Sequence, residues 1–219
     1  MKVCTDSCLF GAWVANKIQS QSPANILDIG TGTGLLSLMI EQKYNSIIDA
    51  IDIDNNAVMQ ATENFQASPW SQYLHCYHED VLNLTSATKY EFIISNPPFF
   101  ENDLLPQTEG KKNSKHANKL NLQALIIATD TLLKNPGCFG ILLPYSRVEY
   151  FEEEVKKYSL FVNEKLYIRQ SAKHGFFRAI LLLERKQQPV KQAELSIRND
   201  NNEYTPEFIA LLKDYYLYL

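Results

Sequence analysis

Residues 27–36 read LDIGTGTGLL, and this stretch joins an apolar strand to a helix through Gly30, Gly32 and Gly34. Glycine allows a tight turn and a close approach of backbone to ligand, and a helix that starts here offers unpaired N–H groups. The dinucleotide fingerprint G-x-G-x-x-G would need another glycine where Leu35 stands. The stretch therefore predicts a ligand-binding turn in an α/β sheet, but not a site for NAD or FAD.

Strands and helices alternate along most of the chain. Strands are predicted at 24–29, 46–53, 73–78, 90–95 and 137–144, and helices at 5–18, 34–44, 55–67 and 121–133. Such alternation indicates parallel strands joined by right-handed crossovers. Residues 164–170 and 178–186 are two further strands with only a short link, which indicates an antiparallel edge pair. We predict one α/β domain over residues 1–219, a doubly wound, mostly parallel seven-stranded sheet with helices on both faces.

Carboxylates follow the second and third predicted strands. Ligands of doubly wound sheets bind at the carboxyl ends of the strands. Asp52 lies 22 residues after Gly30, where a carboxylate can accept both hydroxyl groups of a ribose. Asp80 can accept a hydrogen bond from an exocyclic amine such as that of adenine, whereas Asp54 is expected to cap a helix. Signals at three consecutive strand ends favour a nucleotide-like ligand over unrelated caps and loops.

The fourth strand ends in the sequence SNPPFF, residues 95–100. Pro97 and Pro98 cannot donate hydrogen bonds to a sheet, so the strand must stop and its carbonyl groups must face something else. Taken alone, the motif is more typical of a turn with a core aromatic residue. Its position after the glycine turn and both carboxylates favours a binding site instead.

Composition narrows the possible functions. The chain has 219 residues, 45% of them hydrophobic and 21% charged, with no repeat and no apolar run close to the roughly 18 to 20 residues that span a bilayer. Its four cysteines form no C-x-x-C pair, and no histidine lies beside a nucleophile motif. We therefore expect a cytoplasmic protein with reduced thiols, no metal site, no membrane contact and no triad chemistry. The sequence does not specify an oligomeric state.

Charge is unevenly distributed. Residues 106–191 hold 15 lysines and arginines against 8 acidic residues, although the whole chain has a net charge of -4. Lysine is most concentrated in residues 109–119, which read EGKKNSKHANK. This segment is compatible with a surface that meets phosphates, although a solvated loop is the simpler interpretation of a lysine cluster by itself.

The motifs LDIGTGTG, IDID, HEDV and SNPPFF, in this order, resemble those of Rossmann-like S-adenosylmethionine-dependent methyltransferases, in particular enzymes that methylate planar nitrogen. Residues 1–13, 64–74 and 196–219 more narrowly resemble the bacterial tRNA1(Val) (adenine(37)-N6)-methyltransferases. The chain departs from that family at Cys4 and Ser7, where glycine is more usual. The resemblance covers nearly the whole chain.

The resemblance implies a cofactor site and a catalytic turn. The residues implied to bind S-adenosylmethionine are Asp28, Gly30, Thr31, Gly32, Gly34, Asp52, Ile53, Asp80, Val81 and Asn96. The implied catalytic residues are Asn96, Pro97, Pro98 and Phe99. The Asn96 side-chain oxygen and the Pro97 carbonyl could accept the two hydrogens of an adenine amine, and Phe99 could stack on the base. No metal is required.

The resemblance also implies a tRNA partner, bound through its anticodon arm. The candidate phosphate contacts are Lys111, Lys112, Lys115, Lys119, Arg147, Arg169, Lys173 and Arg178. Because residues 101–119 are polar and lack periodicity, we expect this segment to be mobile without RNA and ordered with it.

Three other functions stay open at this point. Release-factor glutamine methyltransferases use a similar Asn-Pro-Pro-aromatic turn, but only 27 residues precede Asp28 here, which leaves no room for their extra helical domain. Ribosomal RNA guanine-N2 methyltransferases are a further enzyme class, with longer tandem-domain members. A noncatalytic RNA-binding module could also retain the fold, but the intact SNPPF sequence argues against it.

Overall fold

The computed structural model describes residues 4–18, 23–84, 89–98 and 122–218. Within them, eight strands form one sheet in the order β3-β2-β1-β4-β5-β7-β6-β8. The strands are β1 (Asn25–Ile29), β2 (Ile47–Asp52), β3 (Leu74–His78), β4 (Tyr90–Ser95), β5 (Leu133–Pro144), β6 (Phe161–Arg169), β7 (Phe176–Glu184) and β8 (Lys191–Ser196). The first five strands pair in parallel. Strand β7 runs antiparallel to both β5 and β6, and β8 runs parallel to β6.

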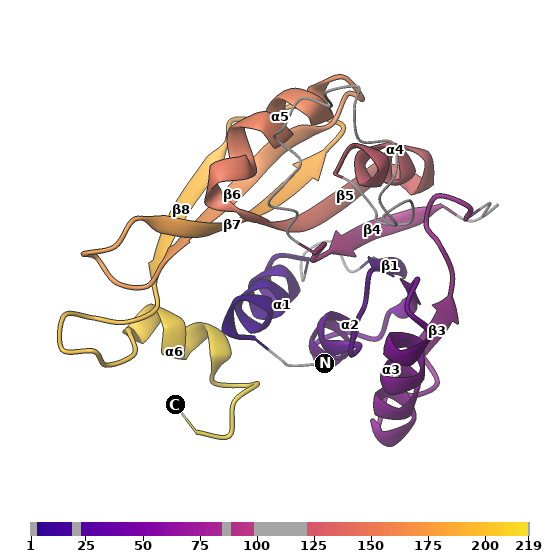
Figure 1. Ribbon diagram of the computed structural model, residues 1–219, viewed down its shortest axis with the longest axis horizontal. Helices are drawn as coiled ribbons and strands as arrows, with labels where there is room; N and C mark the ends of the chain where they lie inside the picture. Colours follow the sequence, from indigo (N-terminus) through magenta and orange to yellow (C-terminus); the bar gives the residue numbers. More distant parts are fainter. Residues whose placement is uncertain (1–3, 19–22, 85–88, 99–121, 219) are drawn as a thin grey trace, which may run out of the picture.

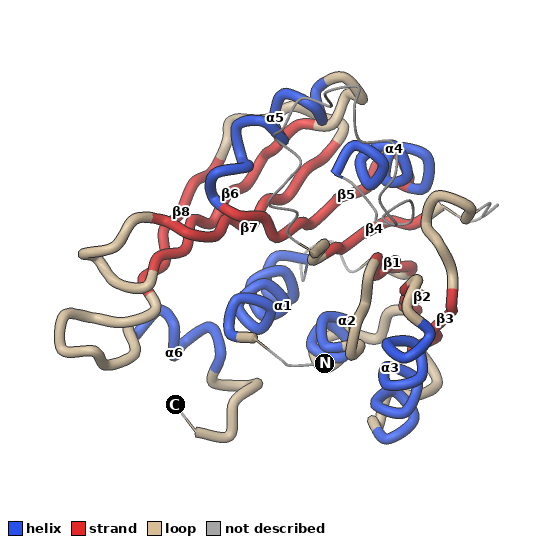
Figure 2. The backbone as a smooth tube through the Cα atoms, viewed as in Figure 1, coloured by secondary structure: helices blue, strands red, loops and turns tan. Residues whose placement is uncertain are grey.

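Helices cover both faces of the sheet, as Figures 1 and 2 show. The helices are α1 (Thr5–Ile18), α2 (Leu35–Glu41), α3 (Asn55–Ala67), α4 (Leu122–Leu132), α5 (Val148–Lys156) and α6 (Pro206–Leu212), with a short 3-10 turn, η1 (Tyr145–Arg147). Helices α4 and α5 lie on one face, and α1, α2, α3 and α6 lie on the other.

Two hydrophobic cores result from the alternation of side chains along each strand. Ile26 packs under α1 and α2, whereas the next residue, Leu27, packs on the side of α4 and α5. Because successive side chains of a strand point to opposite faces, the four consecutive buried residues Ile26–Ile29 show that β1 is covered on both sides.

The predicted fold class is confirmed, but the count of seven strands is wrong. An eighth strand, β8, pairs with β6, so the antiparallel strands β6 and β7 are not the outermost pair. Four of the six residues of β8 are exposed, as an edge strand allows, and this polarity hides it in the sequence. Helices α5 and α6 were also not predicted.

The topology brings the predicted site together at one edge. Strands β1, β2, β3 and β4 are parallel neighbours, so their carboxyl ends share that edge. The glycine turn follows β1, Asp52 ends β2, Asp80 follows β3 and Asn96 follows β4. These four segments lie near the point where strand order reverses between β1 and β4, the usual ligand position in such sheets.

Candidate active site

The glycine turn adopts a backbone that side chains disfavour. The φ angles of Gly30, Gly32 and Gly34 are 72°, 60° and 79°, all in the left-handed region. A Cβ atom at Gly34 would lie 2.4 Å from the ring of Phe65, whereas a Cβ at Gly30 would meet no atom within 4 Å. Gly34 is therefore needed for packing, and Gly30 faces open space at the mouth of the turn.

Asp28 supports this turn from inside the protein. The side chain is fully buried, and its Oδ2 accepts hydrogen bonds from the hydroxyl groups of Thr31 and Ser37, both at 2.7 Å. Its Oδ1 is buried without a hydrogen-bond partner among the residues described here. Burial raises the pKa of Asp28 to about 6, although the two hydroxyl groups oppose the shift. Asp28 thus ties the glycine turn to α2.

Asp52 is half-buried at the end of β2. Its Oδ2 accepts a hydrogen bond from the backbone N–H of Gly32 at 2.9 Å, and its Oδ1 accepts one from the N–H of Asp54 at 2.9 Å. Each oxygen retains a lone pair for a ligand. The next side chain, Ile53, is 48% exposed, which gives this corner an apolar surface beside the carboxylate.

Asp54 and Asp80 have local roles in the backbone. Asp54 caps α3 by accepting a hydrogen bond from the N–H of Asn56 at 2.9 Å, as predicted. The Oδ1 of Asp80 accepts one from the N–H of Leu82 at 3.0 Å, which shapes the turn after β3. Asp80 is half-buried, whereas Val81 is buried in the core beside α4. Asp80 therefore stays a predicted ligand contact, and Val81 packs behind the turn.

The Asn-Pro-Pro turn is anchored through the residue before it. The buried Ser95 donates a hydrogen bond from its hydroxyl group to the backbone carbonyl of Ile29 at 2.9 Å, which joins the ends of β4 and β1. Asn96 is half-buried, Pro97 is buried and Pro98 is exposed. Phe99 lies outside the described residues. The turn is thus fixed beside the glycine turn, at the same edge of the sheet.

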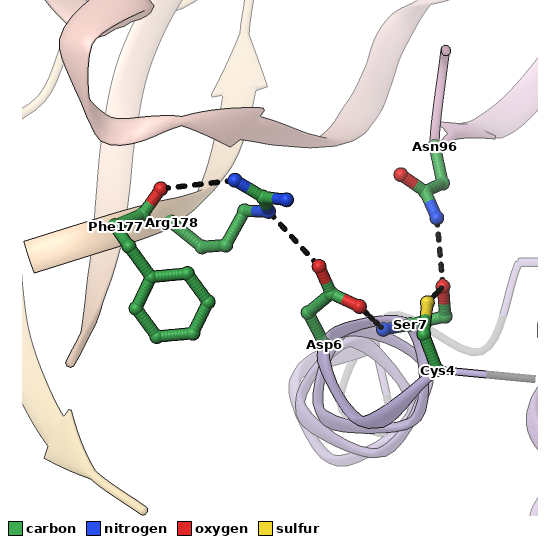
Figure 3. Close-up of polar contacts among 6 residues, drawn as sticks. All are labelled: Cys4, Asp6, Ser7, Asn96, Phe177 and Arg178. Atoms are coloured by element: carbon green, nitrogen blue, oxygen red, sulfur yellow. Dashed lines mark hydrogen bonds and ion pairs between the residues drawn. The ribbon is translucent and has the colours of Figure 1, made fainter. Parts of the chain in front are cut away.

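Sequence reasoning missed a partner of Asn96 on α1. The Asn96 Nδ2 donates a hydrogen bond to Ser7 Oγ at 2.8 Å, and Ser7 Oγ lies 2.9 Å from Cys4 Sγ (Figure 3). The adjacent Asp6 pairs with Arg178 of β7 at 2.9 Å. Ser7 and Asn96 are 89 residues apart, and no signal in the sequence links them.

The candidate RNA contacts lie in several settings. Lys173 is the most exposed of those described, with 69% of its side chain accessible and Asp200 3.3 Å away. Arg169 pairs with Glu194 and lies over the Phe176 ring, whereas Arg178 pairs with Asp6. Arg147 is half-buried in η1. Lys111, Lys112, Lys115 and Lys119 lie outside the described residues.

The described part of the chain contains neither a candidate metal site nor a candidate membrane-spanning helix. No group of three or more histidine, cysteine or acidic side chains there could hold a metal ion. No helix within the described ranges is long and apolar enough to span a membrane.

Comparison with solved structures gives the fold. A predicted O-methyltransferase from Agrobacterium tumefaciens superposes with a TM-score of 0.71 at 13% identity, covering 94% of this chain and 95% of that one. An S-adenosylmethionine-dependent methyltransferase from Clostridium acetobutylicum superposes with a TM-score of 0.58 at 16% identity, covering 84% and 92%. At these identities the similarity concerns the fold alone.

Sequence comparison gives the family. Residues 11–138 match the family model "Methyltransferase small domain". A tRNA1(Val) (adenine(37)-N6)-methyltransferase from Dyadobacter fermentans is 37% identical over an alignment of 222 positions that covers 99% of this chain and 91% of that protein. The protein with the same name from Flavobacterium psychrophilum is 35% identical over 220 residues, covering 99% and 93%. With a full-length match above one-third identity and the glycine, aspartate and Asn-Pro-Pro segments at one edge of its sheet, this chain belongs to the tRNA1(Val) (adenine(37)-N6)-methyltransferase family.

Proposed function

We propose that the protein transfers a methyl group from S-adenosylmethionine to the N6 amine of an adenine in tRNA, the adenine beside the anticodon of tRNA1(Val). The observation that carries this proposal is the position of Asn96. Its side chain lies at the end of β4, next to the glycine turn, and is held by Ser7 through its Nδ2. The names of the relatives support the choice of substrate.

The residues at the edge of the sheet fit S-adenosylmethionine. The open space at Gly30 admits a ligand close to the backbone, and the lone pairs of Asp52 suit the two hydroxyl groups of a ribose. The exposed Ile53 can cover the face of an adenine, and Asp80 can accept a hydrogen bond from its amine. When bound, this cofactor supplies an electrophilic methyl group, so no metal and no covalent nucleophile are needed.

The Asn-Pro-Pro turn has the groups that activate an aromatic amine. The lone pair of an adenine N6 is delocalised into the ring, so the amine is a poor nucleophile. Asn96 Oδ1 and the Pro97 carbonyl can each accept one N–H of that amine, which favours a tetrahedral nitrogen with a localised lone pair. Proline carbonyls at a strand end are free for this role because the ladder of hydrogen bonds has stopped. Phe99 remains the candidate for stacking on the base.

The charge distribution supports an RNA partner. Residues 106–191, which hold an excess of lysine and arginine, follow the Asn-Pro-Pro turn in the sequence. Positive charge of this kind suits the phosphates on either side of a bound base. Bases in an anticodon loop can be unstacked at low cost, so a single adenine can enter the site. A tRNA substrate also implies that the enzyme works in the cytoplasm.

The test is to incubate the protein and methyl-labelled S-adenosylmethionine separately with bulk tRNA, ribosomal RNA and a release factor, and to identify the labelled nucleoside or amino acid. We expect labelled N6-methyladenosine, located by mass spectrometry beside the anticodon of tRNA1(Val), and no label with Asn96→Ala. Label in N2-methylguanosine of ribosomal RNA, or in a glutamine of a release factor, would instead identify one of the other nitrogen methyltransferases. Absence of label in every substrate would favour a binding module.

A further inference from the structure

We propose that Ser7 is a positioning residue for Asn96, and that the ion pair between Asp6 and Arg178 holds Ser7 in place. The inference rests on the proposed function, because it concerns the orientation of the amide that would receive the target amine. The three side chains come from the first turn of α1 and from β7, and Figure 3 shows the contacts in the order Arg178, Asp6, Ser7 and Asn96.

The orientation of the Asn96 amide decides whether it attracts or repels an amine. One end of an amide side chain donates two hydrogens and the other end accepts. Asn96 Nδ2 donates to Ser7 Oγ at 2.8 Å, and Oδ1 points away from Ser7 (Figure 3). Rotation of the amide by 180° would present N–H groups to an amine that itself has only N–H groups to offer. The bond to Ser7 therefore selects the productive orientation.

Ser7 selects this orientation when its own proton is donated elsewhere, because its Oγ then acts only as an acceptor toward Asn96. Cys4 Sγ lies 2.9 Å from Ser7 Oγ, so the hydroxyl proton can be donated to the sulfur atom while a lone pair of Oγ faces Asn96. The residue is 8% exposed, so little water competes for these contacts. Ser95 fixes the backbone just before Asn96, which leaves the side-chain torsions as the freedom that Ser7 removes.

Asp6 and Arg178 fix the turn of helix that carries Ser7. Asp6 Oδ1 accepts a hydrogen bond from the backbone N–H of Ser7 at 3.1 Å, and its Oδ2 accepts one from Arg178 Nε at 2.9 Å. Arg178 also donates from Nη1 to the carbonyl of Phe177 and lies over the ring of that residue. The two charged side chains are 14% and 24% exposed, so their ion pair is less screened by solvent than one at the surface.

The same ion pair reaches the sheet beside the site. In the sheet, Arg178 is in register with Pro144 at the end of β5, and β5 is the neighbour of β4. Contacts therefore run from β7 through α1 to the side chain of Asn96. An anchor of this kind is expected to change the rate of methyl transfer and not the affinity for the cofactor.

The experiment compares single-turnover methylation of tRNA at saturating RNA and cofactor by wild-type protein, Ser7→Ala, Ser7→Thr and Ser46→Ala. Ser46 is the matched control, because its buried hydroxyl group donates to the Pro23 carbonyl at 2.7 Å. We expect Ser7→Ala to lower the rate about 10-fold, as for the removal of one hydrogen bond. Ser7→Thr should stay within about threefold because it keeps the hydroxyl group, and Ser46→Ala within about twofold.

Three further measurements separate positioning from stability. Calorimetry with S-adenosylhomocysteine should give equal affinities for all four proteins, and thermal unfolding should show that Ser46→Ala is destabilised about as much as Ser7→Ala. In a double-mutant cycle, Arg178→Ala should lower the single-turnover rate by a smaller factor in the Ser7→Ala background than in the wild type. An unchanged rate for Ser7→Ala, or equal losses for alanine and threonine, would overturn the inference. Wild-type protein that leaves tRNA unmethylated would overturn the proposed function instead.

Discussion

The backbone N–H of Gly32 donates a hydrogen bond of 2.9 Å to Asp52 Oδ2, which ties the glycine turn after β1 to the end of β2. Gly30 and Thr31 strengthen the same connection, since both donate N–H hydrogen bonds to the Ile51 carbonyl. The carboxylate proposed to hold a ribose thus also holds the turn that would lie beside the rest of the cofactor. Replacement of Asp52 therefore removes the hydrogen bond to Gly32 and the proposed contact with the ribose at once.

We predict that Asp52→Ala weakens binding of S-adenosylhomocysteine by about 1 to 3 kcal/mol, the range for charge-assisted hydrogen bonds. Isothermal titration calorimetry measures this change. The control is Asp54→Ala, which removes the same charge two residues away but caps α3 instead. The affinity of Asp54→Ala for S-adenosylhomocysteine should stay near that of the wild type. Equal losses of affinity in the two variants would show that Asp52 does not bind the ribose.

Asn96→Ala should lower single-turnover methylation by roughly 100-fold or more, because the hydrogen bonds of the amide to the amine matter most in the transition state. Affinity for S-adenosylhomocysteine should not change. Asn16→Ala, an exposed position on α1, is the control for a general effect of asparagine replacement. A rate for Asn96→Ala close to that of the control would show that the amine is held elsewhere.

The glycine turn offers a pair of alanine substitutions with different physical costs. Gly30→Ala adds only backbone strain at a φ of 72°, about 1 to 2 kcal/mol. Gly34→Ala adds similar strain and also a clash with the buried Phe65 ring, so we expect about 2 to 5 kcal/mol of destabilisation. Urea unfolding measures both free energies. Equal destabilisation by the two substitutions would contradict the packing role of Gly34.

Stability should depend on pH through Asp28. The pKa of this buried carboxyl rises from 3.8 to about 6 in the folded protein, so between these values the folded state binds a proton that the unfolded state has released. The free energy of unfolding therefore falls as pH rises through this window, by up to about 3 kcal/mol. Asp28→Asn does not titrate, so the stability of the wild type relative to this variant should fall between pH 4 and pH 7.

The comparison of the wild type with Asp28→Asn also controls for the titration of other groups. Glu41, whose pKa burial raises to about 7, titrates in both proteins and cancels in their difference. Urea unfolding at several pH values gives the two curves. A difference that stays constant across the window would mean that Asp28 is not protonated more readily in the folded state.

Replacement of Lys111, Lys112, Lys115 and Lys119 by alanine should weaken binding of all tRNAs similarly. For every phosphate that the variant no longer binds, the slope of log affinity against log salt should become shallower by about 0.7 to 0.9. The methylated adenine should stay the same, because phosphate contacts orient RNA without reading its bases. Filter binding over a salt series measures the slope. The control is a variant with alanine at Lys43, Lys134, Lys156 and Lys213, which carries the same change in charge. Equal slopes in the two variants would show that residues 109–119 make no specific contacts with phosphates.

The parallel half of the fold could be predicted because its strands are buried on both faces and separated by helices. Three of the five residues of β1 are isoleucine or leucine, and a glycine turn marks its end. Strand β8 could not be found in this way, since only Leu195 among its six residues is buried. Its pairing with β6 depends on backbone hydrogen bonds, which leave no pattern in the side chains.

The same limit applies to the candidate site. Each residue that follows a strand could be found from local sequence, because the carboxyl ends of parallel strands meet. The partner of Asn96 on α1 could not, since that hydrogen bond depends on how a helix packs across the sheet. Charge alone also does not distinguish Lys173, whose ion pair with Asp200 is exposed, from Arg178, whose ion pair with Asp6 is mostly buried.

The ion pair between Asp6 and Arg178 spans 172 residues, and this distance has a consequence during synthesis on the ribosome. Asp6 is made on the order of 10 seconds or more before Arg178, at an elongation rate of about 5 to 20 residues per second. The C-terminal Tyr215 and Asp214, which bind Met39 and Lys43, arrive later still. A nascent chain can therefore pair strands β1 to β5 before β7 has been made, but the α1 turn beside Asn96 gains its anchor only after β7 has been made.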